Sequence, residues 1–125
     1  MKKILVVEDD PVNGYIMLDF LQAQGFDASL ARTGADGVAA FEKDRPDMMI
    51  VDVLLPLKNG FEVCWHVKRA AEKMPVLMMS AIYKDLQHAE EYTKEGLNAQ
   101  GFLVKPFDMW ELLDRVKSLL GAGQA

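Results

Sequence analysis

The sequence predicts an α/β fold with a doubly wound, five-stranded parallel sheet and five helices. Three observations lead to this prediction. Five short apolar segments alternate along the chain with five longer segments in which apolar residues recur three and four positions apart, the spacing of an amphipathic helix. Most of the short segments are apolar at consecutive positions, which is typical of strands covered on both faces. Parallel strands need crossover connections, and right-handed crossovers place helices on both faces of a sheet.

Length and composition fit one domain and exclude several classes of protein. The chain has 125 residues, of which 50% are hydrophobic and 26% charged. A net charge of -5 argues against a nucleic-acid-binding surface and favours protein or small-molecule partners. The single cysteine cannot form an internal disulfide, and no apolar run approaches the roughly 20 residues of a membrane span. We expect a cytoplasmic domain over residues 1–121, with residues 122–125 as a short tail or truncated linker.

The first strand is expected at residues 4–7, where four consecutive apolar residues precede three acids. Pro11 fits the first turn of a helix over about residues 12–24, and Gly25 stands where a helix commonly ends. The second strand is expected at residues 27–31. It is only partly apolar, as is typical of a strand near the edge of a sheet.

Thr33 is a suitable N-cap for the second helix, which ends at the breaker formed by residues 44–47. Residues 48–52 predict the third strand, which is apolar until its last residue, Asp52. The third helix is expected from Gly60 to about Ala71. This arrangement places Asp52 at the carboxyl end of a buried strand.

The fourth strand is expected at residues 76–80, directly after a proline. Residues 85–95 are polar and charged with apolar residues at helical spacing, so the fourth helix is expected to be largely exposed. The fifth strand is expected at residues 101–104. Asp108 is a suitable N-cap for the fifth helix, which ends at Gly121.

Polar side chains follow the ends of the predicted strands, where ligands bind in sheets of this type. They are Glu8, Asp9, Asp10, Asp52, Ser80 and Lys105. Any one of them alone is more often a solvated loop residue. As a cluster they need another explanation, because two carboxylates about 4 Å apart repel by roughly 4 kcal/mol at an effective dielectric constant near 20.

A cluster of acids needs compensating positive charge. Lys105 supplies one charge, and the remaining deficit suits a hard divalent ion with oxygen ligands, Mg²⁺. Histidine and cysteine, the usual zinc ligands, are absent from these strand ends. A carboxylate beside Mg²⁺, a lysine and a hydroxyl has the parts for phosphoryl transfer. Asp52 is the candidate nucleophile, because it stands alone at its strand end rather than among other acids.

With this pattern the chain resembles the receiver domain of two-component response regulators over essentially its full length. The residues that carry the resemblance are 4–10, Pro46-Asp47, Asp52 with Pro56 and Gly60, 75–81, and Lys105-Pro106-Phe107. The resemblance implies a flavodoxin-like topology with strand order 2-1-3-4-5. It also implies a signalling switch rather than a turnover enzyme.

The resemblance assigns roles to the acidic residues. Asp52 is implied to be the phosphoacceptor, which receives its phosphoryl group from a histidine kinase or a phosphotransfer protein of a phosphorelay. Mg²⁺ is implied to be bound directly by Asp9, by Asp52 and by the backbone carbonyl of Leu54. Glu8 is implied to act on the same ion through water.

The resemblance also implies how the signal leaves the site. Ser80 and Lys105 would contact separate phosphoryl oxygens, and the Lys105–Pro106 bond is expected to be cis. Phe102 takes the place of the switch aromatic and would turn in when phosphorylation draws Ser80 inward. The face formed by helix four, strand five and helix five would then change. The implied output is an effector protein or a covalently linked domain, through a monomer or a phosphorylation-dependent dimer, without direct contact to nucleic acid.

Two features depart from the family pattern. The segment between Ser80 and Lys105 has 24 residues, which is longer than we expect for the family. The difference concerns the surface around the fourth helix rather than the acidic site. The second departure is that the usual Gly-Ala before the fifth strand reads Asn98-Ala99-Gln100-Gly101. Phenylalanine instead of tyrosine at position 102 also removes a hydroxyl, so the switch would be read by packing alone.

Two alternative functions stay open from the sequence. One is a receiver-shaped interaction module that signals without phosphorylation. The other is a small phosphatase with Asp52 as nucleophile, although Leu54 stands where such an enzyme needs a second acid. The apolar side chains of Leu54 and Ile82 cannot orient an attacking water, so we predict a phosphoryl lifetime of minutes or longer.

The remaining polar and sulfur-containing residues on the helices are interpreted as structural. His66 and His88 lack a second ligand at metal-binding spacing and are expected to be solvated. Lys68 and Arg69 are expected to lie on a solvated helix face. Cys64 is expected to be a small buried hydrophobic residue.

Overall fold

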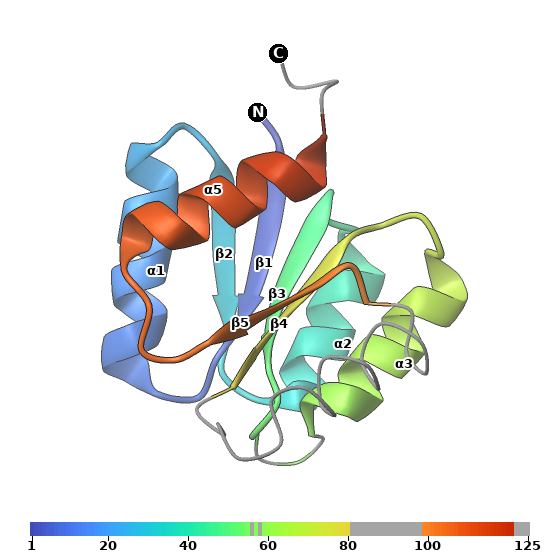
Figure 1. Ribbon diagram of the computed structural model, residues 1–125. Helices are drawn as coiled ribbons and strands as arrows, with labels where there is room; N and C mark the ends of the chain where they lie inside the picture. Colours follow the sequence, from blue (N-terminus) through green and yellow to red (C-terminus); the bar gives the residue numbers. More distant parts are fainter. Residues whose placement is uncertain (56, 58, 81–98, 122–125) are drawn as a thin grey trace.

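A five-stranded parallel sheet forms the centre of the computed structural model, which describes residues 1–55, 57, 59–80 and 99–121 (Figure 1). The strands are β1 (Lys3–Val7), β2 (Asp27–Ala31), β3 (Met48–Asp52), β4 (Val76–Ser80) and β5 (Gly101–Val104). Their order, β2-β1-β3-β4-β5, confirms the predicted doubly wound topology. The described helices are α1 (Pro11–Ala23), α2 (Gly34–Lys43), α3 (Gly60–Ala70) and α5 (Met109–Leu120). The helix predicted at 85–95, Ile82, His88 and the tail at 122–125 lie outside the described residues.

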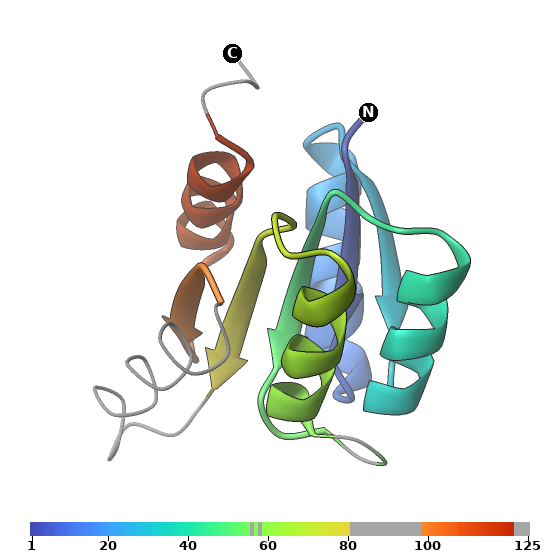
Figure 2. The ribbon, with the colours of Figure 1, turned by 90° about the vertical axis from the view of Figure 1, so that its right-hand side faces the viewer.

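Of the described helices, α1 and α5 cover one face of the sheet and α2 and α3 cover the other, as the side view shows (Figure 2). Alternate residues of the strands point to opposite faces, so each face has its own apolar cluster. On one face Met17 and Leu21 of α1 and Leu112 of α5 pack against the sheet. On the other face Phe41 of α2 and Val63 of α3 do so. Both faces of β3 and β4 are buried, which agrees with their continuous apolar sequences.

Each described helix begins at a side-chain cap. The capping residues are Asp10, Thr33, Asn59 and Asp108, and each accepts a hydrogen bond from a backbone N–H in the first turn of its helix. The predicted caps Thr33 and Asp108 are therefore confirmed. No helix in the described part of the chain is long and apolar enough to cross a membrane.

The loop between β3 and α3 is closed tightly at its base. The N–H of Gly60 donates to the carbonyl of Val53 at 2.8 Å. A Cβ atom on Gly60 would lie only 2.1 Å from the backbone oxygen of Asp52, so this position requires glycine. Leu57, in the same loop, has a positive φ of 69°. The helix that follows β3 is thus held directly against the end of the strand that carries Asp52.

The prediction that Lys68 lies on a solvated face is wrong. Only 5% of the residue is exposed, because the chain after α3 folds back over its side chain. Its Nζ donates to the carbonyls of Glu72 (2.5 Å) and Met74 (2.8 Å) and to Oε1 of Gln100 (3.2 Å). The three acceptors are neutral, and burial lowers the pKa of Lys68 below its ordinary value.

The other structural interpretations on α3 agree with the model. Cys64 is fully buried, and burial raises the pKa of its thiol to about 11. His66 is partly exposed and lies 2.8 Å from a carboxylate oxygen of Glu42 on α2. Arg69 stacks on the exposed ring of Trp65, with 4.4 Å between the guanidinium carbon and the ring centroid.

Candidate functional site

The register of the parallel strands brings the predicted site residues to one edge of the sheet. β1 and β3 pair in register to the end of β1, so Glu8 and Asp52 occupy the next two neighbouring positions. β4 ends at Ser80, one residue beyond the level of Asp52. The backbone N–H of Lys105 donates to the carbonyl of Ser80 at 2.8 Å, which fixes Lys105 just after β5. Four segments that are far apart in the sequence therefore meet at one place.

Lys105 joins two buried carboxylates. Its Nζ lies 2.6 Å from Oδ2 of Asp52 and also forms an ion pair with Oε1 of Glu8. The other oxygen of Asp52, Oδ1, accepts a hydrogen bond from the backbone N–H of Leu54 at 3.0 Å. Both oxygens of Asp52 are thus held by donors, and only 8% of its side chain is exposed.

The close packing of these groups shifts the pKa values of Glu8 and Lys105. Burial raises the pKa of Glu8 to about 7, and the neighbouring Asp52 adds to the increase while Lys105 opposes it. Burial on its own would lower the pKa of Lys105. The hydrogen bonds and negative charges of Asp52 and Glu8 outweigh burial and raise it above its ordinary value. Lys105 is therefore a stable cation at neutral pH, whereas Glu8 is close to its titration midpoint.

Three carboxylates lie close enough to share a metal ion. Glu8, Asp9 and Asp52 each offer an oxygen, and these oxygens lie within 4.8 Å of one another. Such a set of hard oxygen donors fits the coordination preferences of Mg²⁺. Asp10 is not part of this group, because its Oδ1 accepts the N–H of Val12 and caps α1.

Ser80 and Phe102 lie on neighbouring strands beside the acidic group. Ser80 is buried at the end of β4. Phe102 is also buried and belongs to the apolar cluster under α2 and α3. Its carbonyl accepts a hydrogen bond from Nη1 of Arg115 on α5 at 3.0 Å. The ring of Phe102 is therefore already buried in this structure, before any inward turn. The Lys105–Pro106 bond is cis, as the resemblance implies.

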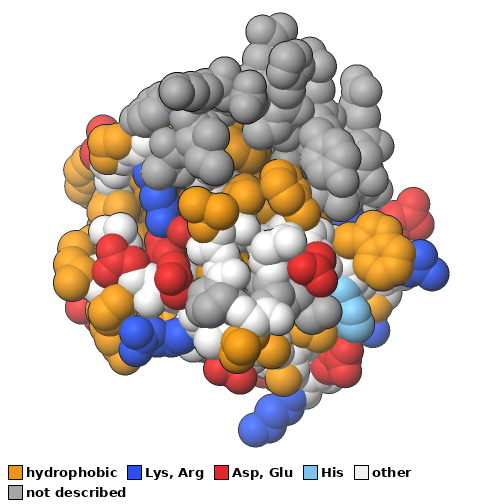
Figure 3. All heavy atoms as spheres, turned by 90° about the horizontal axis from the view of Figure 1, so that it is seen from below, with side chains coloured by type: hydrophobic (Ala, Val, Ile, Leu, Met, Phe, Trp, Pro, Cys, Tyr) orange, Lys and Arg blue, Asp and Glu red, His pale blue; other side chains and the backbone are white. Residues whose placement is uncertain are grey.

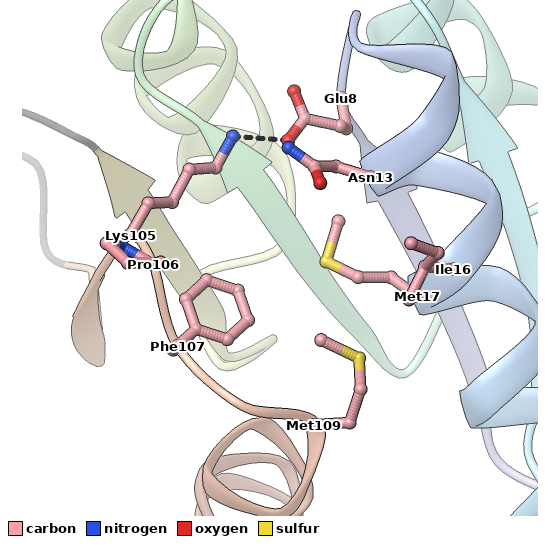
Figure 4. Close-up of a pocket in the computed structure, with 8 residues that line it drawn as sticks. All are labelled: Glu8, Asn13, Ile16, Met17, Lys105, Pro106, Phe107 and Met109. Atoms are coloured by element: carbon pink, nitrogen blue, oxygen red, sulfur yellow. Dashed lines mark hydrogen bonds and ion pairs between the residues drawn. The ribbon is translucent and has the colours of Figure 1, made fainter.

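A pocket of about 150 Å³ adjoins the acidic group between α1 and the chain that follows β5 (Figure 4). The Nζ of Lys105 points toward Glu8 at one side of the pocket, with the amide of Asn13 next to them. Met17, Phe107 and other apolar residues line the opposite side. Seen from the carboxyl ends of the strands, acidic side chains gather beside a basic one, with hydrophobic side chains around them (Figure 3).

Sequence reasoning missed two contributions to the site. The N–H of Leu54 orients Asp52, but a backbone donor has no signature in the sequence. Asn13 lines the pocket, and its position two residues into a helix that directly follows the acids was the only available signal.

Comparison with known proteins places these features in context. The family model for the response regulator receiver domain matches residues 4–117. Transcriptional regulatory protein PcoR of Escherichia coli is 36% identical over 120 residues, which are 96% of this chain and 52% of PcoR. Transcriptional activator protein IrlR of Burkholderia pseudomallei is 37% identical over 123 residues, which are 98% of this chain and 52% of IrlR. The chain thus spans about half the length of the curated relatives it matches.

Solved structures show the same architecture. The structure of the chemotaxis protein CheY4 of Vibrio cholerae has a TM-score of 0.86 and 28% sequence identity, with 95% of this chain and 98% of that chain covered. A CheY-like receiver domain protein of Methanospirillum hungatei has a TM-score of 0.88 at 22% identity, covering 96% of this chain and 94% of that chain. The second likeness concerns the fold alone.

Proposed function

Because the chain belongs to the response regulator receiver domain family, we propose that it is a phosphoacceptor switch in which Asp52 receives a phosphoryl group. Receiver domains of response regulators are signalling proteins rather than catalytic enzymes, and the family implies a histidine kinase partner. The observation that carries the proposal is the position of Asp52. Its carboxylate lies between the ammonium of Lys105 and the N–H of Leu54, beside two further acids.

In the proposed reaction an oxygen of Asp52 attacks the phosphorus of a phosphohistidine on the kinase or on a phosphotransfer protein. A P–O bond forms, the P–N bond breaks, and the imidazole leaves with the electron pair of that bond. Lys105 moves from the carboxylate to a phosphoryl oxygen and compensates its charge. The hydroxyl of Ser80 donates to another phosphoryl oxygen.

The proposed cofactor is Mg²⁺, held directly by Asp9, Asp52 and the backbone carbonyl of Leu54, and through water by Glu8. The three clustered carboxylates support this assignment. When bound, Mg²⁺ stabilises negative charge on the phosphoryl oxygens. The acids would hold the ion next to Lys105, so the proposed transfer depends on the three carboxylates and Lys105 together.

The proposed conformational change that transmits the signal begins at β4. Phosphorylation replaces one negative charge on Asp52 by nearly two, which draws Ser80 toward the site. The change passes to β5 and α5 and to the segment that precedes β5, through a monomer or a phosphorylation-dependent dimer. PcoR and IrlR are named as transcriptional regulators. By analogy the output of this cytoplasmic switch is a linked domain or a separate effector protein.

The test uses the purified chain with Mg²⁺ and acetyl phosphate. We expect intact-protein mass spectrometry to show one added phosphoryl group and peptide mapping to place it on Asp52. Asp52→Asn removes the modification. Asp10→Asn is the matched control, because it removes a neighbouring acid, keeps a capping side chain and retains phosphorylation.

Two results would contradict the proposal. One is that the wild-type chain forms neither an acyl phosphate with acetyl phosphate nor a beryllofluoride adduct at Asp52. The other is a physiological output that Asp52→Asn leaves unchanged, which favours the phosphorylation-independent interaction module. Repeated release of phosphate from small esters would favour the phosphatase.

A further inference from the structure

Leu57 combines an unfavourable backbone conformation with an unburied apolar side chain. Its φ of 69° lies in the left-handed region, which glycine and asparagine adopt readily and leucine does not. The residue is 82% exposed. Strained positions of this kind cluster at functional sites, where the strain is balanced by a gain elsewhere.

The tight loop explains the conformation but not the choice of leucine. The loop is pinned at its base by the hydrogen bond from Gly60 to Val53 and by the contact of Gly60 with the backbone of Asp52. Glycine would supply the positive φ at position 57 without strain. Because Leu57 is 82% exposed, contacts with the described residues do not offset the cost of leucine.

The position of Leu57 indicates which contact, outside the described chain, could offset the cost of its backbone conformation. The loop directly follows Asp52, whose side chain is only 8% exposed, so a protein that delivers a phosphoryl group to Asp52 has to come close to the loop. Leu54 on the same loop and Val12 at the start of α1 are also exposed, in agreement with the hydrophobic side chains that border the acidic group in Figure 3. A small phosphodonor such as acetyl phosphate presents no protein surface to these side chains.

We propose that Leu57 is a specificity-determining contact for the protein phosphodonor, seated against an apolar surface next to the donor's phosphohistidine. This inference rests on the proposed phosphoacceptor role of Asp52. Leu57 does not take part in the chemistry. It contributes to transfer only by stabilising the complex in which the donor's phosphohistidine meets Asp52.

The experiment compares two phosphodonors. One is acetyl phosphate, and the other is a purified histidine kinase that, within a panel of kinases, phosphorylates the wild-type chain fastest. The variants are Leu57→Gly, which removes the side chain and the strain, Leu57→Asn, which keeps a similar size but is polar, and Leu57→Met, which stays apolar. Transfer rates are measured over a range of chain concentrations, together with melting temperatures.

We expect Leu57→Gly and Leu57→Asn to need about tenfold more chain for half-maximal transfer from the kinase, which corresponds to about 1.4 kcal/mol. Their maximal transfer rate, their rate with acetyl phosphate and their melting temperature should not fall. Leu57→Met should behave as the wild type does. Unchanged kinase transfer in Leu57→Gly overturns the inference, as does an equal loss with both donors.

Two other outcomes of the same experiment would have a different meaning. If the wild-type chain accepts phosphate from neither donor, the proposed function itself fails. If Leu57→Gly abolishes a dimer seen in analytical ultracentrifugation but leaves kinase transfer unchanged, the surface is occupied by a second copy of the chain, and the inference is overturned.

Discussion

At the scale of single residues, Glu8 has a carboxyl whose charge changes with pH near neutrality. Its carboxyl is fully buried next to Asp52 and forms an ion pair with Lys105. Burial raises its pKa from 4.5 to about 7, so the folded chain holds a proton at mildly acidic pH that the unfolded chain releases. Protonation therefore favours the folded state between these two pH values.

This shift predicts the pH dependence of stability without metal. The contribution of Glu8 is fully present below pH 4.5 and is lost as the pH rises through about 7. The free energy of unfolding in EDTA should therefore carry a decreasing component of at most about 3 kcal/mol from Glu8. Urea titrations at several pH values, on the wild type and on Glu8→Gln, isolate it. The variant should show a flatter profile, and an identical slope in both proteins would refute the assignment.

At the scale of elements, Lys68 joins the end of α3 to the starts of β4 and β5. Its ammonium binds two carbonyls in the connection that leads to β4 and the side chain of Gln100, which precedes β5. Oε1 of Gln100 also accepts the N–H of Val76, the first residue of β4, at 2.9 Å. One buried cation thus fixes how three elements meet at the end of the sheet opposite Asp52.

We predict that Lys68→Met destabilises the chain by about 2 kcal/mol, because it leaves buried acceptors without a donor. Arg69→Ala is the matched control on the adjacent position. Its exposed side chain stacks on Trp65, so its loss should cost about 0.5 kcal/mol or less. Chemical denaturation of both variants measures the difference. Equal stabilities would mean that the contacts of Lys68 contribute nothing net.

At the scale of the whole molecule, the sequence predicted the topology well because most strands are short apolar runs that end in a polar residue or directly precede one. The positions of Asp52 and Lys105 followed from that pattern together with the rule for parallel sheets. The burial of Lys68 could not be predicted, because it depends on how the chain after α3 folds back. The conformation of Leu57 depends on the closure of its loop at Gly60, which no local pattern reveals.

Metal binding should stabilise the folded chain as a whole. A ligand that binds only the folded state adds about 2.7 kcal/mol when its concentration is 100 times its dissociation constant. We therefore expect the melting temperature to rise on addition of Mg²⁺ and to return on addition of EDTA. Asp9→Asn should abolish the increase, whereas Asp10→Asn should retain it, as differential scanning calorimetry can show. The same increase in Asp9→Asn would place the ion elsewhere.

The long distance along the chain between Lys105 and each of its two ion-pair partners affects the order in which the site can form. Lys105 and Glu8 are 97 residues apart, and Lys105 and Asp52 are 53 apart. During translation, at about 5–20 residues per second, both acids leave the ribosome seconds before their cation. A nascent or clipped chain that lacks Lys105 therefore leaves Glu8 and Asp52 without their ion-pair partner. The proposed switch would therefore be complete only when the segment that carries Lys105 has joined the sheet.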